Sequence, residues 1–245
     1  GLRSVEPLLS QRPSWFELLT AAAFRWFAEA PVDVSVVEVG LLGRYDATNV
    51  VDSHVSIVTG VGGDHTDFAP GWELAVAGEK AGIIGAGSTA VLGRMEPELR
   101  AVFSAEGPAV LVAEGVDFDL LSSRPAVGGR LIEVAGIHER YDDVFLPLHG
   151  PVQGHNAAVA IAAVESFFDR ALDPDLVRDG LAMVRLDGRV EVLSVQPLVI
   201  VDGAHNPDAI AALAVTLDDE FSTVGSRIVV LGTLAGRDPD RTAEA

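Results

Sequence analysis

The sequence contains no cysteine, so disulfide bonds and zinc–thiolate sites are excluded. This absence is typical of a reducing compartment, and we expect the protein to be cytoplasmic. No apolar run approaches the roughly 18 residues that a membrane-spanning helix needs, so no membrane partner is expected. The first ten residues have neither the charged start nor the apolar stretch of a signal peptide, and they lack an initiating methionine. We therefore expect a piece of a longer chain or a processed one.

Basic residues are also scarce. The 245 residues include 17 lysines and arginines against 36 acidic residues, which gives a net charge of −19. A nucleic-acid-binding protein needs the opposite balance, so we expect no nucleic-acid partner. A nucleotide site in so acidic a chain would need magnesium or local arginines to offset the charge. Sixteen of the basic residues are arginines, and Lys80 is the single lysine.

Short β-rich runs alternate with helical patterns in the first half of the chain. This rhythm is typical of βαβ units and predicts a mostly parallel sheet. The predicted strands are Val34–Val39, Val55–Val61, Thr89–Leu92 and Ala109–Val112, and the predicted helices between them are Trp72–Ile84 and Pro97–Ser104.

The pattern changes at Asp117. Segments Arg130–Val134 and Val144–Leu148 alternate in the manner of antiparallel strands. The elements predicted after them are helices at Gln153–Phe168, Asp173–Val184 and Pro207–Glu220, and strands at Leu198–Val201 and Ile228–Leu231. We expect two domains, residues 1–187 and residues 188–245.

Two polar clusters follow predicted apolar strands. The first, EVGLLGRYDATNVV, covers residues 38–51, and the second, GGDHTDF, covers residues 62–68. In open parallel sheets, ligands collect beyond the carboxyl ends of the strands, and carboxylate oxygens suit Mg²⁺. Glu38 is therefore a candidate magnesium ligand, and His65 is a candidate catalytic residue. The alternatives are a turn in which Glu38 pairs with Arg44, and a histidine with a structural role.

Two further motifs lie on predicted helices. GEKAGII, residues 78–84, places Lys80 in an otherwise apolar helix, and QGHNAAVAIAAVE, residues 153–165, begins with a polar turn followed by small residues. Asn156 could hydrogen-bond the edge of a base. The alternatives are a surface lysine that covers the helix with its methylenes, and a helix cap with tight helix packing.

The last motif, VIVDGAHNPDA, covers residues 199–209 and reads as a buried strand, a turn and a helix opened by Pro207. A helix N-terminus favours phosphate because its first amides have no partner within the helix. Asp202, at the end of the strand, could hold ribose hydroxyls. The alternative is an ordinary strand–turn–helix joint that Asn206 caps. A short GRVEV motif, residues 188–192, lies at the expected domain junction.

The order of these motifs is more specific than any of them alone. EVGLLGRYDATN, DHT, GEKAGI, GHNAA, GR and DGAHNP follow one another as in the folylpolyglutamate synthase / dihydrofolate synthase branch of the Mur ligase superfamily. The chain closely resembles this family from about Phe16 to Asp238. The resemblance implies an α/β fold: a partial P-loop-type ATPase domain with a mostly parallel sheet, followed by a partial Rossmann-like C-terminal domain.

The resemblance also implies a reaction. In this family, ATP phosphorylates a carboxylate of the acceptor, dihydropteroate or a folate, and the amine of L-glutamate then displaces phosphate from the acyl phosphate. ATP and Mg²⁺ are the implied cofactors, L-glutamate and the acceptor are the implied partners, and the family leans toward monomers. By position in the motifs, the resemblance implies metal binding by Glu38, His65 and a carbamylated Lys80, catalysis by Lys80, His65 and His205, adenine contact by Asn156, ribose contact by Asp202, and phosphate contacts by Arg189 and His205.

The chain departs from the family pattern at several points. The usual Gly-Gly of the first motif is Leu42-Gly43, a His expected before Gln153 is Val152, and a common Pro is Asp187. The family also carries a Gly-rich lysine loop of the GTNGKGS type that holds phosphates and Mg²⁺, and these 245 residues contain no such loop. We therefore expect a chain that is truncated at both ends and inactive by itself.

Several functions stay open at this point. The first expectation is a bifunctional dihydrofolate and folylpolyglutamate synthase, followed by a monofunctional synthase and then by a Mur-type peptidoglycan ligase. The alternative from another class is an inactive remnant or a binding module, which the missing loop favours. The retention of Glu38, His65, Lys80, Asp202 and His205 indicates that the coding region came from a working enzyme.

Overall fold

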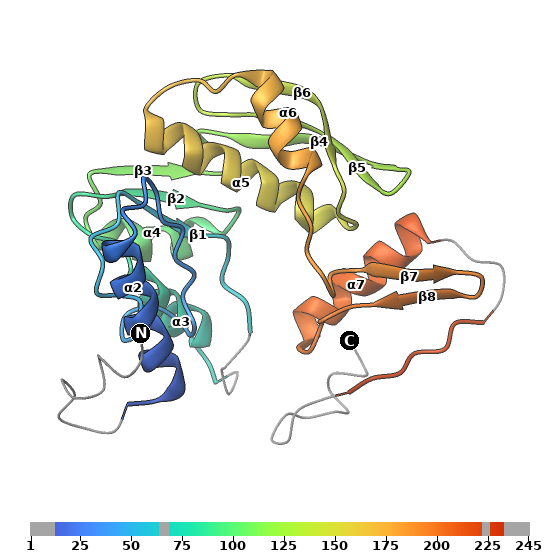
Figure 1. Ribbon diagram of the computed structural model, residues 1–245, viewed down its shortest axis with the longest axis horizontal. Helices are drawn as coiled ribbons and strands as arrows, with labels where there is room; N and C mark the ends of the chain where they lie inside the picture. Colours follow the sequence, from blue (N-terminus) through green and yellow to red (C-terminus); the bar gives the residue numbers. More distant parts are fainter. Residues whose placement is uncertain (1–12, 64–68, 222–225, 233–245) are drawn as a thin grey trace.

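The computed structural model describes residues 13–63, 69–221 and 226–232. Within them lie three sheets: a parallel one, an antiparallel one and a two-stranded hairpin. Figure 1 shows the first two sheets on either side of a long helix, and the hairpin with its helix beside them. No helix in the described part of the chain is both long and apolar enough to cross a bilayer.

The parallel sheet comprises β1 (Val55–Val58), β2 (Thr89–Leu92) and β3 (Val110–Ala113), in that spatial order. Helix α3 (Trp72–Ala81) connects the first two strands, and α4 (Pro97–Ala105) connects the second and third. Parallel neighbours need a crossover connection, and a helix lies in each connection here. The βαβ rhythm predicted from the sequence is therefore confirmed.

Both faces of the parallel sheet are buried, as expected for parallel strands. On one face Ala90 and Leu92 pack with Phe103 of α4 and with small residues of α3. On the other face Val91 and Val112 pack against the long helix α5 (Pro151–Phe168). Alternate residues of β2 therefore enter two separate apolar clusters, which fixes the strand between its covering helices.

Helix α5 also covers the antiparallel sheet, formed by β4 (Asp119–Ala126), β5 (Gly129–Ala135) and β6 (Arg140–Leu146). The small residues of its motif permit this central position. A Cβ at Gly154 would lie only 3.0 Å from Leu120 Cδ2, so the helix and the β4 strand approach closely. Helix α6 (Pro174–Ala182) packs against β6.

The remaining elements follow a connection through residues 183–190. Strands β7 (Glu191–Val195) and β8 (Leu198–Val201) form an antiparallel hairpin, and α7 (Pro207–Glu220) follows them. Asn206 begins α7 because its side chain accepts a hydrogen bond from the amide of Ala209 at 2.8 Å. The α/β class predicted from the sequence is confirmed.

Two predicted strands are wrong. Residues 34–39 and 228–231 are apolar, but they form no strand within the described residues. Val36 is 91% exposed, and Ile228 is also largely exposed. A strand requires a neighbour that accepts and donates its backbone hydrogen bonds, and an apolar sequence pattern supplies no such neighbour. Conversely, helix α2 (Trp15–Glu29) was not predicted, although Ser14 and Glu17 form a capping box at its start.

Candidate functional site

Polar residues follow the strands at the carboxyl edge of the parallel sheet. Glu114, directly after β3, is buried and accepts a hydrogen bond from the amide of Arg94 at 2.9 Å. The carboxylate also accepts a hydrogen bond from Nδ1 of His155 on α5. This pair was missed in the sequence, although Glu114 ends an apolar run and His155 precedes Asn156. Ligands of open α/β sheets bind beyond this edge.

The first motif forms a loop that is closed on itself by Asp46. The carboxylate of Asp46 accepts hydrogen bonds from the amide of Leu41 at 2.9 Å, the amide of Thr48 at 2.9 Å and the hydroxyl of Thr48 at 2.6 Å. Burial alone would raise the pKa of Asp46, but these hydrogen bonds outweigh it and hold the pKa below its usual range. The Asp and Thr of DATN therefore shape the loop.

The same loop packs against the end of α3 that carries the GEKAG motif. The side-chain amide of Asn49 donates to the carbonyls of Arg44 and Gly82, both at 3.0 Å. The backbone amide of Arg44 donates to the carbonyl of Glu79 at 2.8 Å. A side chain at Gly82 would collide with Arg44. The two motifs therefore form one unit, with Lys80 half-buried in the last turn of α3.

Glu38 is exposed and lies in the segment that was predicted as a strand. The guanidinium of Arg44 pairs with Glu106 rather than with Glu38, and the hydrogen bond from Arg44 to Glu106 raises the pKa of Arg44. His65 lies outside the described residues, so its convergence with Glu38 on one ion stays a prediction. Among the described residues, no group of three or more His, Asp or Glu side chains is arranged to hold a metal ion.

The DGAHNP turn is joined to the GR motif by backbone contacts. Asp202 accepts hydrogen bonds from the amide of Val190 at 2.8 Å and from the amide of Ala204 at 2.6 Å. The amide of Gly203 donates to the carbonyl of Gly188 at 2.8 Å. The two motifs, separated in the sequence by the β7–β8 hairpin, thus meet at its open end.

His205 lies on the DGAHNP turn, and the side chain of Arg189 from the GR motif lies beside that turn. The guanidinium of Arg189 occupies the space that a side chain at Gly203 would take, so the guanidinium lies directly against this turn. Nδ1 of His205 donates to the carbonyl of Gly203 at 2.7 Å, which places the proton of the neutral ring on Nδ1. The structure therefore brings Arg189, Asp202 and His205 together, as a shared site requires.

This turn also contacts the loop after β1. Oδ2 of Asp208, in the first turn of α7, accepts a hydrogen bond from the amide of Gly63 at 2.9 Å. Gly63 belongs to the GGDHTDF motif. The start of α7 therefore lies beside the carboxyl edge of the parallel sheet, although the two segments are 145 positions apart.

Asn156 is exposed in the first turns of α5, and its side-chain amide donates to Oε1 of Gln153 at 3.2 Å. It is not the cap of the helix, a position that Gly150 occupies. A cavity of about 480 Å³ lies at the opposite, amino-terminal edge of the sheet, where His54 and Ser88 line it. Asn49 and Gly82, whose hydrogen bond joins the first motif to GEKAGII, also line this cavity.

Comparison with known proteins agrees with this arrangement. Residues 188–245 match the family model of the Mur ligase glutamate ligase domain. Over 240 residues the chain is 45% identical to the dihydrofolate synthase/folylpolyglutamate synthase of Mycobacterium tuberculosis, which covers 93% of this chain and 49% of the relative. It is 35% identical over 230 residues to the folylpolyglutamate synthase of Lacticaseibacillus casei, covering 91% of this chain and 53% of the relative.

Solved structures give the same result. The M. tuberculosis folylpolyglutamate synthase complexed with ADP and AMPPCP matches with a TM-score of 0.86 and 44% identity, over 90% of this chain and 54% of that one. A folylpolyglutamate synthase–AMPPCP–folate complex matches with a TM-score of 0.80 and 32% identity, over 88% and 54%. The chain spans about half the length of the curated relatives it matches. Over that half, the chain belongs to the folylpolyglutamate synthase/dihydrofolate synthase family of Mur ligases.

Proposed function

We propose that this chain supplies the nucleotide-binding part of an ATP-dependent ligase that joins L-glutamate to a folate through an amide bond. The observation that carries the proposal is that Arg189 lies beside the turn that carries Asp202 and His205. The contact between Asp208 and Gly63 holds this turn beside the loop after β1. Similar solved structures bind ADP, AMPPCP and folate, which supports these ligands here.

The reaction consists of two transfers. The γ-phosphoryl group of ATP passes to a carboxylate oxygen of the acceptor, which gives ADP and an acyl phosphate. The amine of L-glutamate then attacks the acyl carbon, phosphate leaves with the electrons of the broken C–O bond, and the amine loses a proton. Catalysis of phosphoryl transfer depends mainly on positioning and on charge stabilisation.

The DGAHNP turn, the neighbouring Arg189 and the start of α7 have suitable groups for the phosphates. The guanidinium of Arg189 can donate two parallel hydrogen bonds to phosphate oxygens. The N-terminus of α7 adds its backbone amides and the positive end of the helix dipole. His205, on the turn beside Arg189, carries a ring nitrogen that donates to the carbonyl of Gly203, which orients the imidazole. We assign phosphate contacts to Arg189 and His205.

Adenosine recognition follows from two side chains. The two oxygens of Asp202 each accept one backbone amide, and each retains a lone pair that can accept a ribose hydroxyl. Asn156 offers an amide donor and an acceptor, the pattern that pairs with the edge of adenine. We assign the ribose to Asp202 and the base to Asn156.

We propose Glu38, His65 and a carbamylated Lys80 as the magnesium ligands. The described residues do not by themselves form an ion site, so no step of the reaction is routed through the ion. Mg²⁺ would neutralise phosphate charge when bound. Carbamylation of Lys80 requires a neutral amine, which an arginine at this position could not supply.

We further propose that residues 1–187 and 188–245 are separate domains, that the protein is monomeric and cytoplasmic, and that dihydropteroate is a second acceptor. The names of several relatives support the second acceptor, since they combine dihydrofolate synthase with folylpolyglutamate synthase. The alternative, a nucleotide-binding module without turnover, is favoured by the lack of a Gly-rich lysine loop in these 245 residues.

Titration of the chain with a fluorescent ADP analogue tests the nucleotide site. We expect weak binding that Arg189→Ala reduces about tenfold, the loss expected for one charge-assisted contact of roughly 1.4 kcal/mol. Arg185→Ala is the matched control, because Arg185 is an exposed arginine of the same segment. Equal affinities of the two variants would refute the assignment of Arg189.

A further inference from the structure

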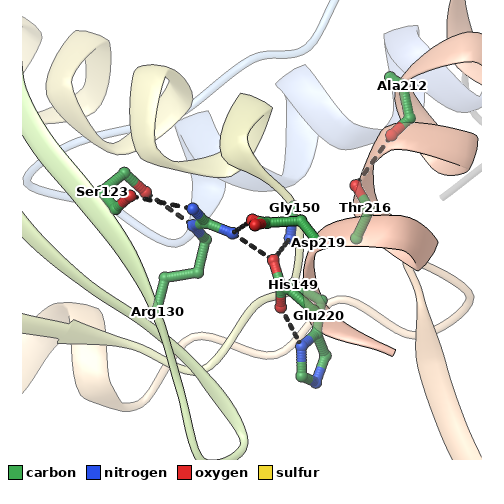
Figure 2. A network of polar contacts seen from close by, with 8 residues as sticks. All are labelled: Ser123, Arg130, His149, Gly150, Ala212, Thr216, Asp219 and Glu220. Carbon is green, nitrogen blue, oxygen red and sulfur yellow. Dashed lines mark hydrogen bonds and ion pairs between the residues drawn. The ribbon is translucent and has the colours of Figure 1, made fainter. Parts of the chain in front are cut away.

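Helix α7 contacts the rest of the protein at its C-terminal end through Glu220 (Figure 2). One carboxylate oxygen accepts hydrogen bonds from Arg130 of β5 and from the amide of Gly150 at 2.7 Å. The other accepts a hydrogen bond from Nδ1 of His149 at 2.6 Å. The Arg130 and Glu220 side chains are only 3% and 4% exposed. Their sequence separation of 90 residues makes this a tertiary contact.

Three further hydrogen bonds hold the guanidinium of Arg130. Nε donates to the hydroxyl of Ser123 at 2.7 Å, and a terminal nitrogen donates to the carbonyl of Ser123 at 3.0 Å. The other terminal nitrogen also reaches Asp219 at 3.1 Å, but that carboxylate is more than one-third exposed. Glu220 is therefore the buried counter-charge of Arg130, and the antiparallel sheet fixes the guanidinium that it meets.

Close packing surrounds the ion pair. Gly150 has a φ of +97°, and a Cβ there would lie 2.7 Å from Oγ1 of Thr216. The buried hydroxyl of Thr216 donates back to the carbonyl of Ala212 at 2.8 Å, as Figure 2 shows. The His149 and Phe221 rings lie 4.9 Å apart. The contact with Thr216 leaves no room for a side chain at Gly150.

The opposite end of α7 makes the second contact, from Asp208 to the amide of Gly63 at 2.9 Å. The helix has 14 residues and spans about 21 Å. It therefore bridges two distant points of the body formed by residues 13–63 and 69–187. One point is the start of α5, which carries Asn156, and the other is the loop after β1.

We propose that Glu220 is a positioning residue: through the pair with Arg130 and the contacts to His149 and Gly150, it holds α7 so that the Asp202–His205 turn faces the β1 loop. The inference rests on the proposed function for what these two loops bind. The position of α7 relative to the body can be measured as a distance between two labels, without any ligand.

The energetics predict opening rather than unfolding when Glu220 is lost. A buried guanidinium that loses its counter-charge is strongly unfavourable. Arg130 belongs to a sheet whose core does not include α7, so water can reach its guanidinium if α7 moves away. Separation of α7 from the body relieves the penalty while both parts stay folded.

The absence of cysteine provides a direct test. Cysteines introduced at the exposed positions Val116 and Val195 give one spin label on the body and one on the β7–β8 hairpin, and pulsed electron resonance reports their distance distribution. In the otherwise unchanged chain we expect one narrow distribution. With Glu220→Ala we expect a longer, broader population, with the closed-to-open ratio reduced on the order of 100-fold.

Asp218→Ala is the matched control, because Asp218 is an exposed acid of the same helix turn whose partner is Arg227. It should leave the distribution unchanged. Glu220→Gln keeps a neutral acceptor for Gly150 and should give a partial shift, and far-ultraviolet dichroism of each variant checks that the helices persist. If Glu220→Ala unfolds the chain, the distance distribution of Glu220→Gln tests the positioning role instead. A distribution equal to that of the control, in either folded Glu220 variant, would overturn the proposal. The proposed function fails separately, if the otherwise unchanged chain does not bind the ADP analogue, and the distance distributions then still decide the role of Glu220.

Discussion

Tyr141→Phe removes a single buried hydroxyl at the junction of β6, α5 and α6. The phenol donates to Oε1 of Glu165 at 2.7 Å and accepts a hydrogen bond from the amide of Leu172 at 3.0 Å. Glu165 is fully buried, and its other oxygen accepts a hydrogen bond from the amide of Ile137 at 2.5 Å. The hydroxyl therefore supplies one of the donors that make a buried carboxylate tolerable.

The expected loss of stability follows from these contacts. A hydrogen bond to a charged group contributes about 1.5–3 kcal/mol. The orphaned amide of Leu172 adds little, because this residue is half-buried and water can reach it. We expect a decrease of about 2–3 kcal/mol in the free energy of unfolding, which lowers the melting temperature by roughly 5–10 °C in a chain of this size.

Tyr45→Phe is the control that the sequence offers, since the chain has two tyrosines and Tyr45 is 86% exposed. This change should stay within about 0.5 kcal/mol. Calorimetry of both variants gives the comparison. Equal melting temperatures of the two variants would show that the hydroxyl does not stabilise Glu165, and the reasoning would be refuted.

Four further predictions follow from particular residues. Burial and the hydrogen bond to Glu165 raise the pKa of Tyr141, so its contribution to stability should be intact below the ordinary tyrosine pKa of about 10 and be lost as the pH rises through the higher folded value; denaturation at increasing pH should show this loss in the parent and not in Tyr141→Phe. Asn206→Ala should destabilise α7 by about 1 kcal/mol, measured by denaturant unfolding, because the hydrogen bond to the amide of Ala209 is lost. The chain alone should release no ADP from ATP above background, since it lacks the Gly-rich lysine loop, and magnesium-dependent turnover would contradict this. In an active ligase that contains this chain, Lys80→Arg should abolish ligation, while Lys80→Ala should regain part of it with added short carboxylates; ligation by Lys80→Arg at the parent rate would exclude the carbamate.

Local signals allowed good prediction of several elements. Helix Pro207–Glu220 was predicted with its observed limits because Asn206 and Pro207 mark its start within the sequence itself. Strand Thr89–Leu92 was predicted equally well, since it is a short apolar run between two helices. Residues 34–39 show the limit of the method: the run is apolar enough for a strand, but pairing depends on residues elsewhere.

Parts of the candidate site were likewise predicted from the sequence, and other parts were found only in the structure. The motifs predicted Arg189, Asp202 and His205 as nucleotide contacts; the structure places Arg189 beside the turn that carries the other two, and their roles stay predictions. The structure also showed that Asp46 and Asn49 of the first motif shape a loop against α3. No motif contains Arg130 or Glu220, and nothing in the sequence connects two residues 90 positions apart, so their contact was found only in the structure.

The most direct test of the central claim is a chimera. This chain replaces the matching half of the M. tuberculosis relative, to which it is 45% identical, and incorporation of labelled glutamate into folate is measured. The account predicts ATP-dependent incorporation that Arg189→Ala reduces and Arg185→Ala leaves unchanged. A folded chimera that binds ADP and folate but forms no amide bond would contradict it.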